Sequence, residues 1–277
     1  MCSWQNLSFV VDTSSWYGVL SVYPADQGGS YDPAASSTFK RGPDLRQSNV
    51  TIGKDVLLKD APFDVLYEFS TNTLDFTGYL GLYRTKDNSS IIQYALEQMD
   101  VKVVTFAFDK LSILDPGGNE GVMVIGGRAP DHCADDWIFV PEYLGTGTGE
   151  QWALELDEFS FGTMTFDSPG YISFWSYYED VIFPVNYKDT LQAALKADDR
   201  WNVPCDATLE ISFRIAGHDI VLLPEDYLVR YDDDTCLVAF GFTGDRRFRV
   251  SYSFMQKHCF LYDYAHAQVG FASRLAA

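Results

Sequence analysis

Two histidine–cysteine pairs, His132-Cys133 and His258-Cys259, are the residues whose types could hold a metal ion. Together they would offer zinc two imidazoles and two thiolates. Adjacent residues on a strand point to opposite faces, so a neighbouring His and Cys seldom reach one metal. We therefore predict no metal site and no cofactor, and expect His218, in a predicted hairpin turn, to be a surface residue. No cysteine has the surroundings of an activated nucleophile, and neither a glycine-rich phosphate loop nor a Ser-His-Asp pattern is visible.

Three N-glycosylation sequons, at Asn6, Asn49 and Asn88, accompany five cysteines. The segment from Met1 to Asn6 has neither a basic region nor an apolar core, so the sequence given contains no signal peptide. Either the protein stays in the cytosol, or its leader and any pro-segment are absent from this sequence. The sequons and cysteines favour the second option, and we predict a secreted glycoprotein or a resident of a lysosome-like acidic compartment.

Composition favours a folded protein rich in strands. The 277 residues are 47% hydrophobic, 16% aromatic and 21% charged. Short aromatic and β-branched runs interrupted by Gly, Pro and Asp are typical of strands. The formal net charge of −19 repels phosphate, so nucleic acid is not expected as a partner. No run of eighteen apolar residues occurs, and we predict no membrane span.

Periodicity predicts an all-β fold with a few short helices. Helical spacing occurs only at Ile91 to Met99 and at Tyr187 to Lys196. Predicted strands are Leu7 to Asp12, Val101 to Phe108, Val122 to Ile125, Leu154 to Phe161, Ile211 to Ile215, Ile220 to Leu223 and Phe260 to Tyr264. We divide the chain into an N-terminal β lobe, residues 1–142, and a C-terminal β lobe, residues 143–277.

Collinear motifs resemble those of the pepsin-like aspartic protease family. Phe9 to Ser15 is similar to its first active-site turn, in which a hydrophobic run leads into D-T-G-S-S. Tyr31 to Phe39 resembles its (F/Y)-(N/D)-P-x-x-S-S-T-F loop, and Gly78 to Leu82 its D-G-I-L-G-L strand. Four further matches in register are Val124 to Gly127, Gln151 to Leu156, Tyr231 to Cys236 and Tyr262 to Ala272. The His-Cys contexts are most similar to nematode members. The resemblance implies a bilobal fold in which each lobe gives one Asp to a substrate cleft.

The paired carboxylates that such an enzyme needs are not both found. Two carboxyl groups at hydrogen-bond distance share one proton, so that one acts as base and the other as acid. The resemblance places Asp12 at the first position, but Ser14 replaces the glycine of D-T-G. At the second position, alignment from the N-terminal side gives Phe174, and alignment from Pro184 gives Trp175. Neither side chain carries a proton.

A carboxylate from a shifted register is the alternative to this loss. Glu179, Asp180 or Asp167 could replace the second Asp only if the strand were rebuilt, and register is firmly set where a face is buried. The flap hairpin that covers substrate in the family is also expected to be truncated or absent, because Lys40 to Lys54 is short and contains no aromatic residue.

The resemblance also implies the disulfides. Cys205 and Cys236 correspond to the C-lobe bridge of the family, and Cys133 and Cys259 correspond to a second bridge in nematode members. Cys2 is left without a predicted role.

The sequence thus predicts a non-catalytic homologue that binds a peptide, a glycan or a protein partner. Aromatic residues near the expected cleft could supply the contacts, since Tyr and Trp are favoured at interfaces. They could equally fill the space left by the lost active site. The alternative function is an acid aspartic endopeptidase with atypical motifs. The candidate contact residues are Trp16, Tyr17, Phe174, Trp175, Tyr177 and Tyr178.

Overall fold

The structure is a computed structural model that divides the chain into two compact units. Unit 1 comprises Met1–Val103 with Ile125–Gly127, and unit 2 comprises Val104–Val124 with Arg128–Ala277. The division at residues 142 and 143 stays a prediction. The structure describes residues 9–12, 20–22, 40–41, 46–52, 56–65, 78–84, 90–109, 121–146, 152–167, 169–176, 180–231, 234–250 and 252–275.

Unit 1 contains a six-stranded sheet in the order β1-β6-β2-β5-β4-β3. The pairs β1·β6 and β2·β5 are parallel, and the pairs β2·β6, β4·β5 and β3·β4 are antiparallel. The strands are β1 (Phe9–Asp12), β2 (Leu20–Val22), β3 (Lys40–Arg41), β4 (Arg46–Ile52), β5 (Val56–Val65) and β6 (Gly78–Gly81). Helix α1 (Ile91–Leu96) begins after Ser90, whose hydroxyl accepts a hydrogen bond from the Gln93 N–H, and the Tyr94 hydroxyl donates to the Lys59 carbonyl on β5 at 2.8 Å.

A five-stranded sheet in the order β8-β7-β22-β23-β9 joins chain segments that are distant in sequence. Its strands are β7 (Val103–Phe108), β8 (Gly121–Ile125), β9 (Ile138–Pro141), β22 (His258–Asp263) and β23 (Gln268–Ser273). Strands β22 and β23 do not alternate between buried and exposed residues. Almost every residue in them is buried, as expected for strands covered on both faces.

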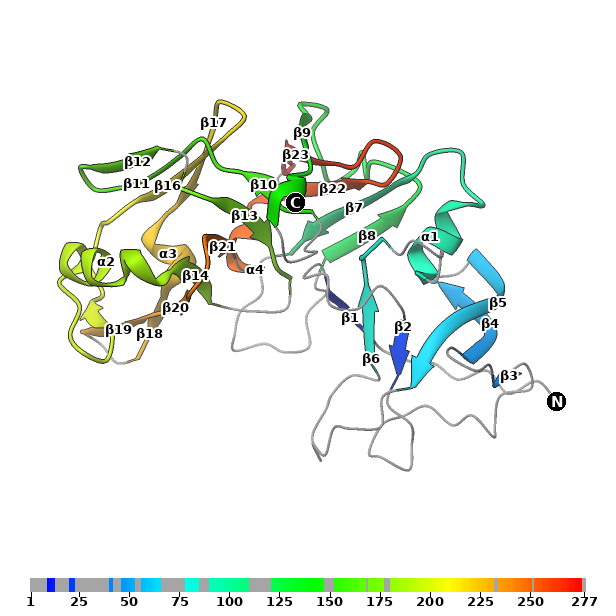
Figure 1. The fold of residues 1–277 in the computed structure, drawn as a ribbon, viewed down its shortest axis with the longest axis horizontal. Helices are drawn as coiled ribbons and strands as arrows, with labels where there is room; N and C mark the ends of the chain where they lie inside the picture. The colour runs from blue at the N-terminus through cyan, green and yellow to red at the C-terminus, as the bar shows by residue number, and fades with distance from the viewer. Residues whose placement is uncertain are drawn as a thin grey trace. The chain divides into compact units, whose positions relative to one another are not determined.

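Unit 2 contains two more sheets (Figure 1). Phenylalanine rings pack between them. One has the order β10-β13-β21-β14-β20, with β10 (Leu154–Glu155), β13 (Tyr171–Phe174), β14 (Val181–Pro184), β20 (Phe240–Thr243) and β21 (Arg247–Val250). The other has the order β12-β11-β16-β17, with β11 (Glu158–Phe161), β12 (Met164–Asp167), β16 (Ile211–Ile215) and β17 (His218–Leu222). The Phe159 ring lies 4.9 Å from Phe248, 5.4 Å from Phe213 and 5.8 Å from Phe183, between centroids. Burial of these rings joins the two sheets.

Short elements complete unit 2. A three-stranded sheet has the order β15-β19-β18, formed by β15 (Asn202–Pro204), β18 (Leu228–Arg230) and β19 (Thr235–Val238). The helices are η3 (Leu144–Thr146), η4 (Val185–Tyr187), α2 (Lys188–Leu195), α3 (Pro224–Tyr227) and α4 (Tyr252–Met255). Within the residues described above, no helix is both long and apolar enough to cross a bilayer.

The all-β prediction and both predicted helices are confirmed, whereas one predicted strand is wrong in detail. Leu154 to Phe161 is not continuous but splits into β10 and β11. The Leu156 N–H bonds to the Gly170 carbonyl, but the next N–H, of Asp157, bonds to the Arg214 carbonyl at 2.9 Å. The backbone therefore leaves one sheet and joins another within one residue. The alternation of apolar and polar residues shifts by one position at Asp157-Glu158, which marks the interruption of the strand but not the change of sheet.

Both predicted disulfides are present. Cys133 is bonded to Cys259 on β22, across a sequence separation of 126 residues. Cys205, just after β15, is bonded to Cys236 on β19, across 31 residues. The two bridges thus close loops of very different length.

We expect removal of the disulfide that closes the longer loop to lower the free energy of unfolding more than removal of the other disulfide. Chain entropy gives about 5 kcal/mol for removal of the Cys133–Cys259 bridge and about 4 kcal/mol for the Cys205–Cys236 bridge. Urea unfolding of the two double Cys→Ala variants measures this. The reverse order of stability would contradict the loop-entropy explanation.

Asp263 organises the turn between β22 and β23. Its carboxylate accepts the backbone N–H groups of Ala265 and His266, at 3.0 and 3.1 Å, and lies 2.8 Å from the His266 ring Nδ1. The Gln268 amide donates to it at 2.9 Å. Burial opposes ionisation, but the hydrogen bonds from His266 and Gln268 outweigh it and lower the pKa of Asp263 below 3.8.

Because the folded-state pKa is depressed, the ionised Asp263 stabilises the fold above the unfolded-state value of 3.8. This contribution is lost as the pH falls through the folded-state pKa. We expect Asp263→Asn to lower the free energy of unfolding at neutral pH, and the difference from the unsubstituted protein to shrink below pH 3.8. Urea titrations at a series of pH values measure it, with the exposed Asp199→Asn as control. A difference that does not change with pH would contradict this role.

Candidate functional site

The two units contain the same four-strand pairing pattern. In unit 1, β1 is parallel to β6, β6 is antiparallel to β2, and β2 is parallel to β5. In unit 2, β13 is parallel to β21, β21 is antiparallel to β14, and β14 is parallel to β20. The repeated pattern allows a residue of one unit to be matched to a residue of the other from backbone pairing alone.

Pairing register makes Phe174 the counterpart of Asp12. Asp12 ends β1 opposite Gly81, and Phe174 ends β13 opposite Val250. One position earlier on each partner strand, Leu80 pairs with Leu20, and Arg249 pairs with Ile182. Leu20 follows Asp12 by eight positions, as Ile182 follows Phe174. The register and the chain spacing therefore agree.

The Phe174 side chain lies in a hydrocarbon environment. It is 2% exposed, and its ring centroid is 4.9 Å from Phe260, 5.2 Å from Phe271 and 6.1 Å from Phe254. These three rings come from β22, β23 and α4, all within unit 2. An ionised carboxylate in such surroundings would be strongly disfavoured.

Trp175 packs against a guanidinium group. Its side chain is 5% exposed, and its backbone N–H donates to the Val250 carbonyl at 2.9 Å. The guanidinium carbon of Arg249 lies 4.1 Å from the centre of the Trp175 ring, a cation–π contact. Arg249 was not singled out from the sequence, although the run Arg247-Phe248-Arg249-Val250 alternates charged and apolar residues as a strand does.

Two carboxylates considered as substitutes lie elsewhere in unit 2. Asp167 ends β12, in the four-stranded sheet, and pairs with Glu158, whereas β13 belongs to the five-stranded sheet. Asp180 is exposed and immediately precedes β14. Neither residue lies on β13.

Several predicted site residues fall outside the described residues. These are Trp16, Tyr17, Tyr177, Tyr178 and Glu179, together with Ser14, Cys2, Asn6 and Asn88. Asp12 is described by its backbone only. The segment from Lys40 to Lys54, where a flap was expected to be reduced, contributes β3 and β4.

The remaining predicted sites have defined places. Both thiols of the two His-Cys pairs are consumed by the disulfide between Cys133 and Cys259, so they are not available as zinc ligands. Burial lowers the pKa of His258 below 6.5. His218 is exposed at the start of β17. Asn49 lies at a bulge of β4, where its side-chain oxygen accepts the Asp60 N–H at 3.0 Å.

Strand-rich units that each contain this parallel–antiparallel–parallel ladder define a bilobal, pepsin-like all-β protein. The sequence model of one family, described as eukaryotic aspartyl protease, matches residues 3–274. The chain belongs to this family. Among curated proteins, none matches the chain significantly.

We expect the packing of Phe174 to be required for stability. Phe174→Ala should lower the free energy of unfolding by about 3–5 kcal/mol, because it leaves a cavity among three aromatic rings. Tyr231→Ala is the control, since that side chain is 79% exposed and its loss should change stability by about 0.5 kcal/mol or less. Urea unfolding of both variants measures the difference. Equal effects would show that Phe174 does not pack as described.

Proposed function

We propose that this family member does not hydrolyse peptides and acts instead by binding a partner. The proposal is supported above all by the matched ladder positions, where unit 1 has Asp12 and unit 2 has Phe174. Hydrolysis by this class needs a base that activates water and an acid that polarises the carbonyl. A phenyl ring can act as neither.

The register favours Phe174 over Trp175 as the residue at the second catalytic position. The surroundings of Phe174 also support the loss of a catalytic acid at this position, because three aromatic rings surround its side chain. A carboxyl group there would have a raised pKa and would be held neutral without a hydrogen-bond partner among those rings.

The exposed fraction of a side chain distinguishes aromatic residues that pack in the core from those that could contact a partner. Phe174 and Trp175, at 2% and 5% exposure, contribute to packing within unit 2. This supports the space-filling role for these two residues. Contact with a peptide, glycan or protein partner is proposed for Trp16, Tyr17, Tyr177 and Tyr178.

Two disulfides support a place of action outside the reducing cytosol. Secretion, or delivery to an acidic lysosome-like compartment, is typical of this family and is part of the proposal. Glycosylation at Asn6, Asn49 and Asn88 belongs to it as well.

The second candidate is an acid aspartic endopeptidase with atypical motifs. Family membership and the retained Asp12-Thr13 pair favour it. It would require a second carboxyl group from outside β13.

A hydrolysis assay tests the choice between these functions. The glycosylated chain is incubated with denatured haemoglobin or casein between about pH 3 and pH 6, which overlaps the range in which a carboxyl pair shares one proton. We expect no cleavage that pepstatin inhibits. Asp12→Asn is the matched control and should behave as the unsubstituted chain does. Pepstatin-sensitive cleavage that disappears in Asp12→Asn would establish the endopeptidase instead.

A further inference from the structure

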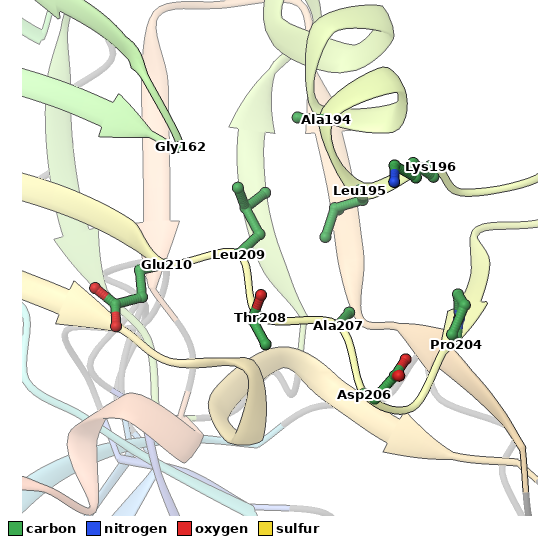
Figure 2. Close-up of a pocket in the computed structure, with 10 residues that line it drawn as sticks. All are labelled: Gly162, Ala194, Leu195, Lys196, Pro204, Asp206, Ala207, Thr208, Leu209 and Glu210. Atoms are coloured by element: carbon green, nitrogen blue, oxygen red, sulfur yellow. The ribbon is translucent and has the colours of Figure 1, made fainter.

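A groove of about 590 Å³ lies in unit 2, away from β13 in the sequence and in the sheet order. One wall is the end of α2, at Ala194, Leu195 and Lys196, and the opposite wall is the segment 204–210. Figure 2 shows the side chains of Leu195 and Leu209 directed into the space between the two walls. This volume is within the range of pockets that bind small ligands or one or two side chains of a peptide.

Both walls are held in place before any ligand arrives. Helix α2 ends with Lys196 in the left-handed conformation, φ 55°, and the Lys196 and Ala197 N–H groups bond to the Ala193 and Gln192 carbonyls. On the other wall, the disulfide of Cys205 anchors the start of the segment.

A buried tyrosine fixes the far end of the second wall. The Tyr227 hydroxyl donates to the Leu209 carbonyl at 2.5 Å, and the Tyr227 side chain is 1% exposed. A preformed site loses less conformational entropy on binding than a flexible one.

The two walls of the groove carry aliphatic side chains, and its rim is acidic. The segment 204–210 alternates, so that Ala207 and Leu209 are partly buried while Asp206, Thr208 and Glu210 are exposed. Among the described residues that line the groove, Asp206 and Glu210 supply two carboxylates and Lys196 supplies one ammonium. The carbonyl end of α2 adds partial negative charge. An apolar group that carries a positive charge beside it fits this arrangement.

We propose that the groove binds an extended basic segment of another protein, in which lysine or arginine stands next to leucine, isoleucine or valine. The aliphatic side chain contacts Leu195 and Leu209, and the neighbouring cation faces Asp206. Anionic ligands are disfavoured by the acidic rim and by the net charge of −19. No aromatic ring lines the groove among the described residues, so a stacked sugar or base lacks a platform.

This inference goes beyond the proposed loss of hydrolysis and does not depend on it. The probe is a fluorescein-labelled, blocked peptide, Gly-Lys-Leu-Arg-Leu-Gly, whose binding to the full chain is followed by anisotropy. Two matched peptides replace either both cations by glutamate or both leucines by serine. We expect the first peptide to bind at least about tenfold more tightly than either of the others, and less tightly as salt is raised.

Variants of the chain locate the binding. Asp206→Lys should weaken binding about tenfold, because it removes an attraction and adds a repulsion of similar size. Ala194→Trp should abolish binding by filling the groove. Asp199→Lys, which makes the same charge change on an exposed residue outside the groove, should leave the binding unchanged. Thermal unfolding of each variant confirms that it is folded.

Three outcomes would overturn the proposal. Equal affinity for the acidic peptide would remove the charge argument, and full binding by Ala194→Trp would place the peptide elsewhere. If the chain formed dimers in a concentration-dependent way and Ala194→Trp abolished them, a second copy of the chain would occupy the groove. Because none of these readouts involves cleavage, they stand apart from the hydrolysis assay.

Discussion

The contact of Phe174 with Phe254, Phe260 and Phe271 is the interaction on which the second unit depends most directly. It joins the five-stranded sheet that contains β13 to the β22–β23 hairpin and to α4. In unit 1 the same ladder position holds a carboxylate residue, Asp12. An aromatic ring at this point gains burial energy where an acid would have to be desolvated. Stability and acid–base chemistry thus make opposite demands on one position.

A second phenylalanine cluster extends this core. Phe159, Phe183, Phe213 and Phe248 pack the β11–β16 sheet against β14 and β21. The disulfides then constrain the parts of unit 2 that contribute few large apolar side chains, the segment around Cys205 and the turn at Cys133. The Cys205–Cys236 bridge links the β15–β19 pair to the start of the segment that forms one wall of the groove. One crosslink therefore constrains both features.

The cation–π pair of Arg249 and Trp175 is a feature of the ladder of unit 2. At the position of Leu80 in unit 1, unit 2 has an arginine, and its guanidinium covers the indole that follows Phe174. Trp175, which follows β13, and Arg249 on β21 depend on each other, because the indole ring gives the guanidinium a partner and the guanidinium covers the ring. Substitution of Trp175 alone would remove the partner of the Arg249 charge, and substitution of Arg249 alone would uncover the Trp175 ring.

The sequence by itself determined the strand-rich class, both α1 and α2, the two disulfide pairs and the family. These depend on local periodicity and on collinear motifs of the chain. Only the tertiary structure decided that Leu154 to Phe161 changes sheets at Asp157, that Arg249 covers Trp175, and that Phe174 ends β13 at the ladder position where Asp12 ends β1. Pairing between strands that are distant in sequence is set by burial of whole faces, and no local pattern along the chain encodes it.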